Sequence, residues 1–215
     1  MCIDNTSTVT LKSNIITGNA VYDGPSGDPS FDPVGYGGGL YLANSTAILT
    51  NTVITDNQAE VLGNGSGLYI ESSAASLLHT TIARNGGGDG SGVYITGTSS
   101  LSSYVMLTNT ILADHSVGIT VAASNTTILN GVLWNNNNMN NGGEGHITVT
   151  NAYTGDLAFG TDGYHLTGFS EAIDKGVNAG VSRDIDGHQR PCGSAPDLGA
   201  DEIYCLYLYL PIIFK

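Results

Sequence analysis

The sequence repeats itself at irregular intervals, and this repetition constrains the fold more than any other feature. One series of segments reads SNIITGN (13–19), NTVITDN (51–57), HTTIARN (79–85), NTILADH (109–115) and NGVLWNN (130–136). A second series reads GLYL (39–42), GLYI (67–70), GVYI (92–95), GITV (118–121) and HITV (146–149). A third apolar position lies between the two series, at Leu11, Leu49, Leu77, Leu107 and Ile128. The pattern therefore predicts three short strands per copy, separated by turns.

Apolar side chains recur at fixed places within the copies. The last segment of each copy carries an aliphatic residue at one position, namely Ile16, Ile54, Ile82, Leu112 and Leu133. In the GLYL-type segments apolar residues alternate with Tyr or Thr, which is typical of a strand with one buried face. Because one copy cannot bury its apolar side alone, neighbouring copies must stack. We therefore predict an all-β, single-stranded parallel β-helix over residues 1–150, a monomeric solenoid of about five coils with three strands per coil.

A polar residue ends the first series in every copy, at Asn19, Asn57, Asn85, His115 and Asn136. Stacked coils lie ~4.8 Å apart, so these side chains would lie directly above one another. Asparagine tolerates the left-handed backbone of a corner, and its amide can bond the amides above and below. We expect a structural ladder at one corner of each coil.

Composition excludes several classes of protein. Gly, Asn and Thr make up about a third of the chain, which disfavours a helical bundle. The net charge is −13, and only Lys12 and Arg84 precede residue 175 among the basic residues, so neither nucleic acid nor an anionic membrane surface is an expected partner. No apolar stretch reaches 18 residues, so we expect no membrane-spanning segment.

An acidic chain of low charge density fits a secreted or cell-surface location. The opening MCIDNTSTVT has neither a basic start nor an apolar run, so this piece shows no export signal. It also begins in the middle of a repeat. We expect the chain to be the C-terminal part of a longer exported protein.

The GGGL and ITDN or IARN segments resemble the repeats of polymorphic outer-membrane proteins and related bacterial right-handed β-helix proteins. Ile or Leu stands here where that family often has Phe. The resemblance covers residues 1–150 and implies a right-handed solenoid. It implies no particular activity, because this fold carries lyases, hydrolases, adhesins and inert stalks alike.

The segment after the repeats resembles a C-terminal module known as choice-of-anchor Q. Three pieces of that module occur in order: AIDKG (172–176), DIDGHQRP (184–191) and DLGADE (197–202). The resemblance implies that residues 151–204 follow the β-helix of an exported bacterial protein. We expect them to form a cap over the last coil, whose open edge would otherwise invite aggregation.

The apolar tail CLYLYLPIIFK (205–215) is too short to span a bilayer. It resembles the YLPxxxK endings of some exported bacterial proteins, which implies a sorting or anchoring element. A final strand packed on the cap is the alternative.

Asp56, Arg84 and Asp114 share one column just before the polar ladder. Carboxylates two coils apart would lie ~9–10 Å from each other, the separation found in inverting glycosidases. A surface salt-bridge ladder is the alternative. Arg84 between the two acids would keep both ionised instead of raising the pKa of one.

Tyr41, Tyr69 and Tyr94 form an outward column, which Thr120 and Thr148 continue. A row of rings spaced by the coil rise could stack on sugar rings. It could equally be an aromatic ladder between neighbouring strands.

Metal and cysteine chemistry is weakly indicated. Asp184 and Asp186 begin a segment like a calcium loop, but the later ligands are missing, so we expect a turn and no cofactor, with Ca²⁺ as the alternative. The five histidines show no zinc-binding spacing. Cys192 and Cys205 flank a turn-rich segment and are candidates for a disulfide, which would leave Cys2 unpaired.

Two classes of function follow. The first is a non-catalytic exported or cell-surface β-helix protein, adhesin-like or in contact with an extracellular glycan or other surface partner. The alternative is a polysaccharide hydrolase or lyase. Lyases of this fold that act on polyuronates need several basic residues, whereas these repeats hold two and the net charge would repel a polyanion. A stalk whose active part lies upstream is a further possibility.

Overall fold

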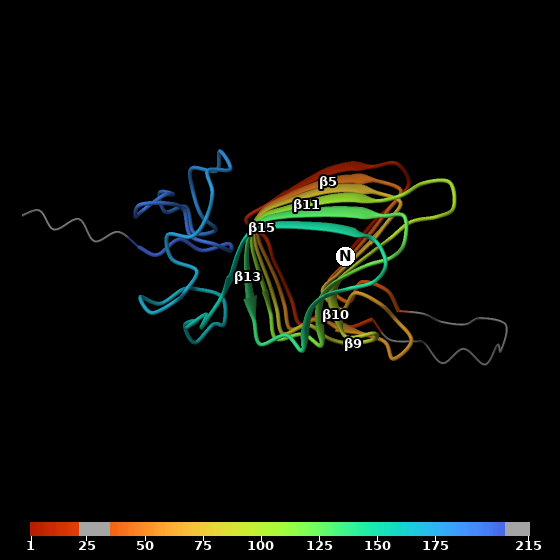
Figure 1. The fold of residues 1–215 in the computed structure, drawn as a ribbon, viewed down its shortest axis with the longest axis horizontal. Helices are drawn as coiled ribbons and strands as arrows, with labels where there is room; N and C mark the ends of the chain where they lie inside the picture. The colour runs from red at the N-terminus through yellow and green to blue at the C-terminus, as the bar shows by residue number, and fades with distance from the viewer. Residues whose placement is uncertain (22–34, 205–215) are drawn as a thin grey trace, which may run out of the picture.

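The computed structural model describes residues 1–21 and 35–204, and Figure 1 shows their arrangement. Within these residues the regular structure consists of fifteen strands and no helix. The strands pair in parallel throughout the two large sheets and in a small two-stranded sheet. The expected all-β class with parallel pairing is therefore confirmed.

The first large sheet, which we call the short-strand sheet, has the order β1-β4-β7-β10-β12-β14. Its strands are β1 (Cys2–Ile3), β4 (Leu40–Ala43), β7 (Leu68–Glu71), β10 (Ser91–Thr96), β12 (Val117–Val121) and β14 (Met139–Gly142). All but the first and last come from the GLYL-type segments. Alternate aliphatic residues of β4, β7, β10 and β12 point into the core, which is why the period of two was visible in the sequence.

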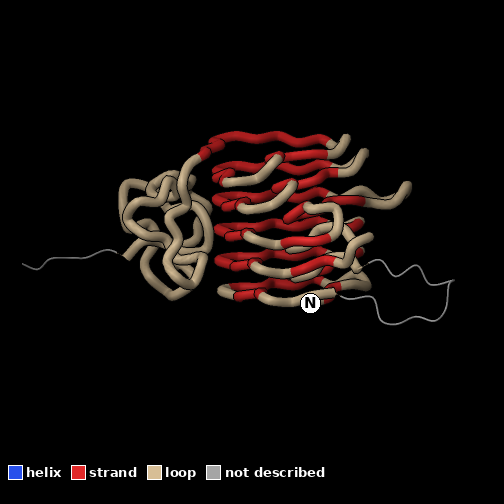
Figure 2. Tube along the Cα trace, turned by 90° about the horizontal axis from the view of Figure 1, so that it is seen from below, coloured by secondary structure: helices blue, strands red, loops and turns tan. Residues whose placement is uncertain are grey.

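The second large sheet, the long-strand sheet, has the order β15-β13-β11-β8-β5-β2, with β3 also paired to β5. Its strands are β2 (Thr8–Lys12), β3 (Ile15–Thr17), β5 (Thr46–Thr55), β8 (Ala74–Ala83), β11 (Tyr104–Ala113), β13 (Thr126–Asn135) and β15 (His146–Thr154). The small sheet joins β6 (Gln58–Ala59) to β9 (Gly86–Gly87). Successive copies of the repeat thus stack as rows, as Figure 2 shows.

The long strands bend in the middle. The bend falls on residues with left-handed backbone: Asn51, His79, Asn109, Gly131 and Asn151, with φ between 48° and 74°. The two strands expected on either side of this point are therefore the two halves of one bent strand, visible at the corner next to the β15 label in Figure 1. Asparagine and glycine adopt this conformation at the lowest cost, which explains their choice here.

The core lies between the two large sheets. It contains the inward columns of both, including Leu49, Leu77 and Leu107, each no more than 1% exposed. Each fully buried leucine contributes about 1.5–3 kcal/mol relative to an exposed one. Stacking of the copies therefore supplies the burial that a single copy lacks.

The expected alignment of the last copy is wrong by one residue. Leu107 pairs with Leu129 and not with Ile128, and Leu112 pairs with Trp134 and not with Leu133. The cause is Gly131, which takes the bend position that Asn109 holds in the preceding copy, with φ of 74°. The side chain of Leu133 consequently points away from the core between the sheets.

HITV (146–149) also lies elsewhere than expected. It begins β15 of the long-strand sheet, where Val149 pairs with Leu129. The last strand of the short-strand sheet is β14, from the asparagine-rich segment, and Thr120 pairs there with Gly142 and not with Thr148. The asparagines concealed this strand because no apolar alternation marks it.

Residues 155–204, the C-terminal segment, are mostly loops. They pack on the outer side of the long-strand sheet, where Leu157, Leu166 and Leu198 cover Ile111 and Leu133. Figure 2 shows this segment beside the stack of rows and not over its end. The segment therefore does not cover the last coil as expected. It packs against the side of the stack, because apolar residues on the outer face of the long strands are buried there. The tail (205–215), including Cys205, lies outside the described residues.

Candidate functional site

The polar ladder runs through four of its five expected members and then shifts by one residue. Asn57 Oδ1 accepts hydrogen bonds from the backbone N–H and Nδ2 of Asn19, at 3.0 and 2.9 Å. Asn85 does the same for Asn57, at 3.0 Å each. After His115, the next member is Asn137, whose Oδ1 accepts from the His115 N–H at 3.0 Å. Asn136 instead follows the Asp114 column, as a consequence of the shift at Gly131.

His115 interrupts this ladder. Its Nε2 lies 3.3 Å from Asn85 Nδ2, whereas its Nδ1 is buried and has no hydrogen-bond partner in the part of the chain that the structure describes. Burial lowers the pKa of His115 to about 4. The ring is therefore neutral at pH 7, and it contributes packing more than hydrogen bonds to the ladder.

The column of Asp56, Arg84 and Asp114 forms one ion pair and no paired-acid site. Arg84 Nε and Nη2 donate to the two oxygens of Asp56 at 2.9 and 2.8 Å, and Nη1 donates to the carbonyl of Gly163 at 2.9 Å. Asp114 accepts from Asn136 Nδ2 at 2.7 Å. The bond from Arg84 lowers the pKa of Asp56, so this carboxyl is ionised where a general acid would need a raised pKa. Arg84 therefore also ties the C-terminal segment to the long-strand sheet.

The tyrosine column stacks on itself. The ring centroids of Tyr41 and Tyr69 lie 5.4 Å apart at 5°, and those of Tyr69 and Tyr94 lie 5.7 Å apart at 4°. Tyr36 stacks on Tyr69 as well, at 4.5 Å, and Tyr69 is only 5% exposed. Burial and the neighbouring Glu71 raise the pKa of Tyr41 to about 12. Because sugars stack on ring faces, rings that cover each other's faces offer a poor platform.

A shallow groove lies at the corner between the short and long strands. Its volume is about 360 Å³, and it crosses four copies of the repeat through segments 6–8, 44–46 and 72–74, with Leu101, Ser102 and Tyr104. Buried serines form its floor, since Ser45 Oγ accepts from Ser7 N–H and Ser73 Oγ from Ser45 N–H. Its rim holds exposed hydroxyl groups and the Tyr104 ring, which is 47% exposed. None of the described lining residues is charged.

The three motifs of the C-terminal segment meet around Arg190, whose side chain is fully buried. Its Nη1 lies 3.1 Å from Glu202 Oε2 and donates to the carbonyl of Asp197, while Nη2 donates to the carbonyl of Ala200. Asp197 in turn accepts from the N–H of Asp174 at 2.8 Å. The acidic and basic residues of these motifs therefore hold loops together.

The bend positions of the long strands bind this segment. Arg190 Nη1 lies 2.7 Å from Nδ1 of His79, and Asn109 Nδ2 lies 2.9 Å from its Nε2. Burial, reinforced by Arg190, lowers the pKa of His79 to about 3. Asn51 donates to the carbonyl of Arg183 at 2.6 Å, and Asn109 exchanges two bonds with the backbone of Val177. The C-terminal segment is therefore hydrogen-bonded to three successive rows along the side of the stack.

The segment that begins like a calcium loop is a turn around Asp184. Asp184 Oδ1 accepts from the N–H groups of Asp186 and His188, at 3.0 and 2.7 Å, and Oδ2 accepts from the N–H of Glu202 at 3.2 Å. Its oxygens are thus occupied by the backbone. The carboxylate of Asp186 stays near this turn, because one of its oxygens lies within 4.8 Å of ligand atoms of Asp184 and His188.

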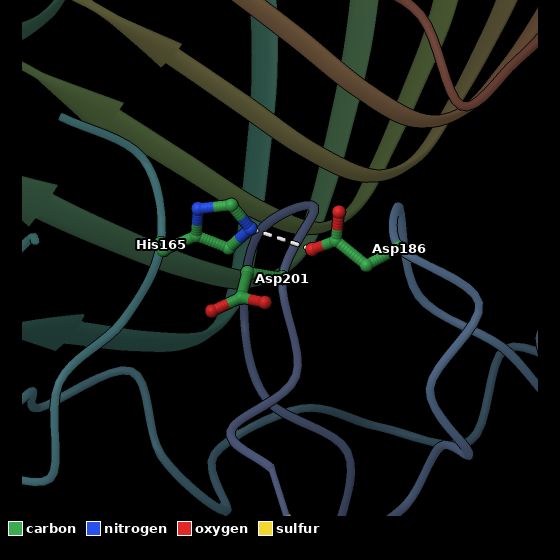
Figure 3. Close-up of side chains that lie close together, drawn as sticks. All are labelled: His165, Asp186 and Asp201. Carbon is green, nitrogen blue, oxygen red and sulfur yellow. Dashed lines mark hydrogen bonds and ion pairs between the residues drawn. The ribbon is translucent and has the colours of Figure 1, made fainter. Parts of the chain in front are cut away.

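Asp186 also joins His165 and Asp201 in a group of possible metal ligands, drawn in Figure 3. His165 Nε2 lies 2.5 Å from Asp186 Oδ2, and its Nδ1 contacts Asp162 Oδ2. Asp201, which is 4% exposed, accepts from the N–H of Leu166 through Oδ2 at 2.7 Å. A ligand atom from each of His165, Asp186 and Asp201 lies within 4.8 Å of the other two.

Negative charges outnumber positive ones around His165. The carboxylates of Asp162, Asp186 and Asp201 surround its imidazole, and in the described residues none of the three pairs with Lys or Arg. Burial alone would lower the pKa of His165, but the bonds to Asp162 and Asp186 outweigh it and raise that pKa to about 9. Burial raises the pKa of Asp201 to about 6.

The sequence gives little warning of this group. Of the ligands in this group, the sequence pattern indicates Asp186 alone, as part of a calcium-type loop. The Asp162–His165 spacing is a local signal, but Asp186 and Asp201 lie 21 and 36 positions beyond His165. Folding of three separate loops brings them together.

Cys192 is disulfide-bonded, and Cys2 is a free, exposed cysteine. Among the described residues no helix has the length and apolar character needed to cross a bilayer. No protein-family model matches this chain, and comparisons with curated proteins and with solved structures give no match either. The two family resemblances therefore stay predictions.

Proposed function

We propose that this chain belongs to an exported or cell-surface protein and acts there as a rigid, non-catalytic right-handed parallel β-helix with an adhesin-like role. The matching register of the rows in both sheets supports a helical path of the chain. The right-handedness of the β-helix and its surface location rest on the sequence resemblances.

The junction between the C-terminal segment and the stacked rows carries this proposal. Asn51, His79 and Asn109 come from three successive rows, and each bonds the same segment. Arg190, which contacts His79, also forms an ion pair with Glu202 in the last of the three motifs. A segment that resembles an anchoring module and is bonded to three rows would hold the whole stack at a fixed orientation on a surface.

The observations do not favour the alternative, a polysaccharide hydrolase with Asp56 and Asp114 as its acids. Arg84 keeps Asp56 ionised, and Asp114 bonds an amide. Hydrolysis by an inverting pair needs one carboxylic acid with a raised pKa.

For a ligand we propose a neutral extracellular glycan in the corner groove rather than on the tyrosine column. The groove combines the exposed ring of Tyr104 with the exposed hydroxyl groups of Thr8 and Thr46, and its lining is uncharged. An aromatic face with nearby hydroxyl groups suits the apolar face and the polar edges of a sugar.

A glycan array tests this ligand. We expect the wild-type chain to bind neutral glycans and Tyr104→Ala to lose that binding at least tenfold. Phe169→Ala is the matched control. Phe169 is 92% exposed, and the substitution removes a ring from the C-terminal segment, which contributes none of the described lining residues of the groove. Loss of binding in Tyr41→Ala with Tyr104→Ala unaffected would return the site to the tyrosine column. The absence of any glycan signal from the wild type would overturn the ligand proposal.

A polysaccharide panel tests the non-catalytic role separately. We expect no release of reducing sugar by the wild type. Release that Asp56→Asn abolishes would refute the scaffold role in favour of the hydrolase.

A further inference from the structure

We propose that His165, Asp186 and Asp201 bind one divalent transition-metal ion, with Zn²⁺ as its reference, and that Asp162 orients the imidazole for this task. The site does not depend on the scaffold role proposed above. It lies in the C-terminal segment, where the loops that carry the three ligands converge (Figure 3).

The donor set selects the class of ion. One imidazole nitrogen and two carboxylate oxygens lie within 4.8 Å of one another. Calcium and magnesium prefer oxygen ligands alone, whereas imidazole suits zinc and its neighbours in the transition series. Three protein ligands with a fourth position open to solvent are a known zinc arrangement, and the side chains of His165 and Asp186 are 33% and 37% exposed.

Asp162 makes the contact that metal-binding histidines need. Its Oδ2 contacts His165 Nδ1, which leaves Nε2 directed at Asp186. Asp162 is itself fixed, because its Oδ1 accepts the N–H groups of Tyr164 and His165 at 3.2 Å each. A carboxylate that holds the second ring nitrogen sets the tautomer and the orientation of the ligating one.

Asp201 supplies an independent indication. This carboxylate is buried, accepts one hydrogen bond from Leu166, and pairs with no Lys or Arg among the described residues. A buried carboxylate needs a positive charge nearby. A divalent ion held by His165, Asp186 and Asp201 would supply that charge.

The exchange of proton for metal is balanced. The ion replaces the proton between His165 Nε2 and Asp186 Oδ2, which are 2.5 Å apart, and that proton leaves to solvent. In a tetrahedral zinc site, neighbouring ligand atoms lie about 3.4 Å apart, so Asp186 moves back by about 1 Å.

A second group, Asp184, Asp186 and His188, serves as the internal comparison. The oxygens of Asp184 already accept three backbone N–H groups, so Asp184 is unsuited to bind an ion. His188 is therefore the matched control: it is a partly exposed histidine beside an aspartate in the same segment.

The experiment uses the untagged, metal-free full chain. Zn²⁺ and, separately, Ca²⁺ are titrated by calorimetry, thermal unfolding is measured with and without each ion, and Co²⁺ is added as a spectroscopic probe of coordination. The variants are His165→Asn, Asp186→Asn and His188→Asn. Circular dichroism and the metal-free Tm establish that each variant is folded.

We expect one Zn²⁺ per chain, and a Tm rise of about 5–10 °C when free Zn²⁺ is 100 times the Kd. His188→Asn should keep this rise, while His165→Asn and Asp186→Asn should lose it together with the Co²⁺ absorption bands. Equal Zn²⁺ affinity in the wild type and His165→Asn would overturn the proposal. A Ca²⁺ effect as large as that of Zn²⁺ that survives His165→Asn would do the same.

Discussion

The Cβ atom that Gly67 lacks would lie 2.8 Å from the side-chain nitrogen of Asn85. Gly39 stands in the same relation to Asn57, again at 2.8 Å. The glycine of each GLYL-type segment and the polar residue that ends the next long strand are therefore two halves of one contact. This contact explains why the two repeated series occur together: the amide can reach its neighbours in the ladder only where the opposing strand has no side chain.

Replacing Gly67 with alanine should lower the free energy of unfolding by about 1–3 kcal/mol. The added Cβ would meet the carbonyl oxygen of Gly92 at 2.8 Å as well as Asn85, and backbone on that side cannot yield. Gly86→Ala is the control, since no atom of the described residues beyond its chain neighbours lies within 4 Å of its Cβ position. Urea unfolding followed by circular dichroism measures both. Equal losses in the two variants would contradict the contact.

Restoring asparagine at position 115 should strengthen the ladder. His115→Asn removes the buried, unpartnered Nδ1 and offers an amide oxygen to Asn85, as Asn85 offers one to Asn57. We expect a gain of about 1 kcal/mol, while Asn85→Ala should cost about 2–3 kcal/mol because it leaves the bonds of Asn57 unmade. Chemical denaturation gives both values. A loss in His115→Asn would mean that packing of the ring against Gly92 outweighs the hydrogen bonds.

Acid should weaken the junction at His79. Its pKa in the folded chain, about 3, lies below the ordinary value of 6.5, so the unfolded chain takes up the proton first. The stability that a neutral His79 contributes is therefore complete above pH 6.5 and is lost as the pH falls from 6.5 toward 3. The slope for one such group is at most about 1.4 kcal/mol per pH unit.

The difference between the wild type and His79→Asn isolates this effect. His115, with a lowered pKa, and Asp201, with a raised one, change stability with pH in opposite directions, but both are present in the two proteins. Urea unfolding at pH 7 and pH 5 should show a smaller acid loss in His79→Asn. Identical losses would contradict a neutral, buried His79.

Removing the buried charge at Arg190 should loosen the C-terminal segment. Arg190→Met leaves Glu202 buried without its partner, and we expect a loss of about 3–5 kcal/mol. Arg183→Met is the control. Arg183 is exposed, and among the described residues its guanidinium bonds the carbonyl of Gly187 alone, so the loss of stability should be within about 0.5 kcal/mol. Limited proteolysis should cut Arg190→Met first within residues 155–204. Early cleavage within the stacked rows instead would place the weakness elsewhere.

Much of the strand arrangement was predictable because the repeat is local information. Columns such as Leu49, Leu77 and Leu107 appear in the sequence at fixed distances from a turn, and parallel stacking at one rise per copy preserves that order. The prediction failed at Gly131, where a glycine replaced the asparagine that marked the bend. Either residue can adopt the left-handed conformation, so the letters alone did not reveal the register.

The candidate sites were less predictable, because their chemistry depends on what lies across from each side chain. The tyrosine column was visible in the sequence, but the stacking of Tyr36 on Tyr69 was not. Arg84 was expected between two acids, yet it bonds one acid and the carbonyl of Gly163. In both cases the partner lies outside the repeated segments, in the loop before β4 for Tyr36 and in the C-terminal segment for Gly163.

The sequence by itself determined most of the strands, their parallel stacking and the first four members of the polar ladder, since each follows from a pattern that recurs from copy to copy. Only the tertiary structure decided where the C-terminal segment docks and which acids meet His165. His79 and Arg190, for example, are 111 residues apart. Such contacts occur once, so no repeated pattern marks them. They form because the folded chain buries polar groups and outward-facing apolar residues, which then pair with residues of distant segments.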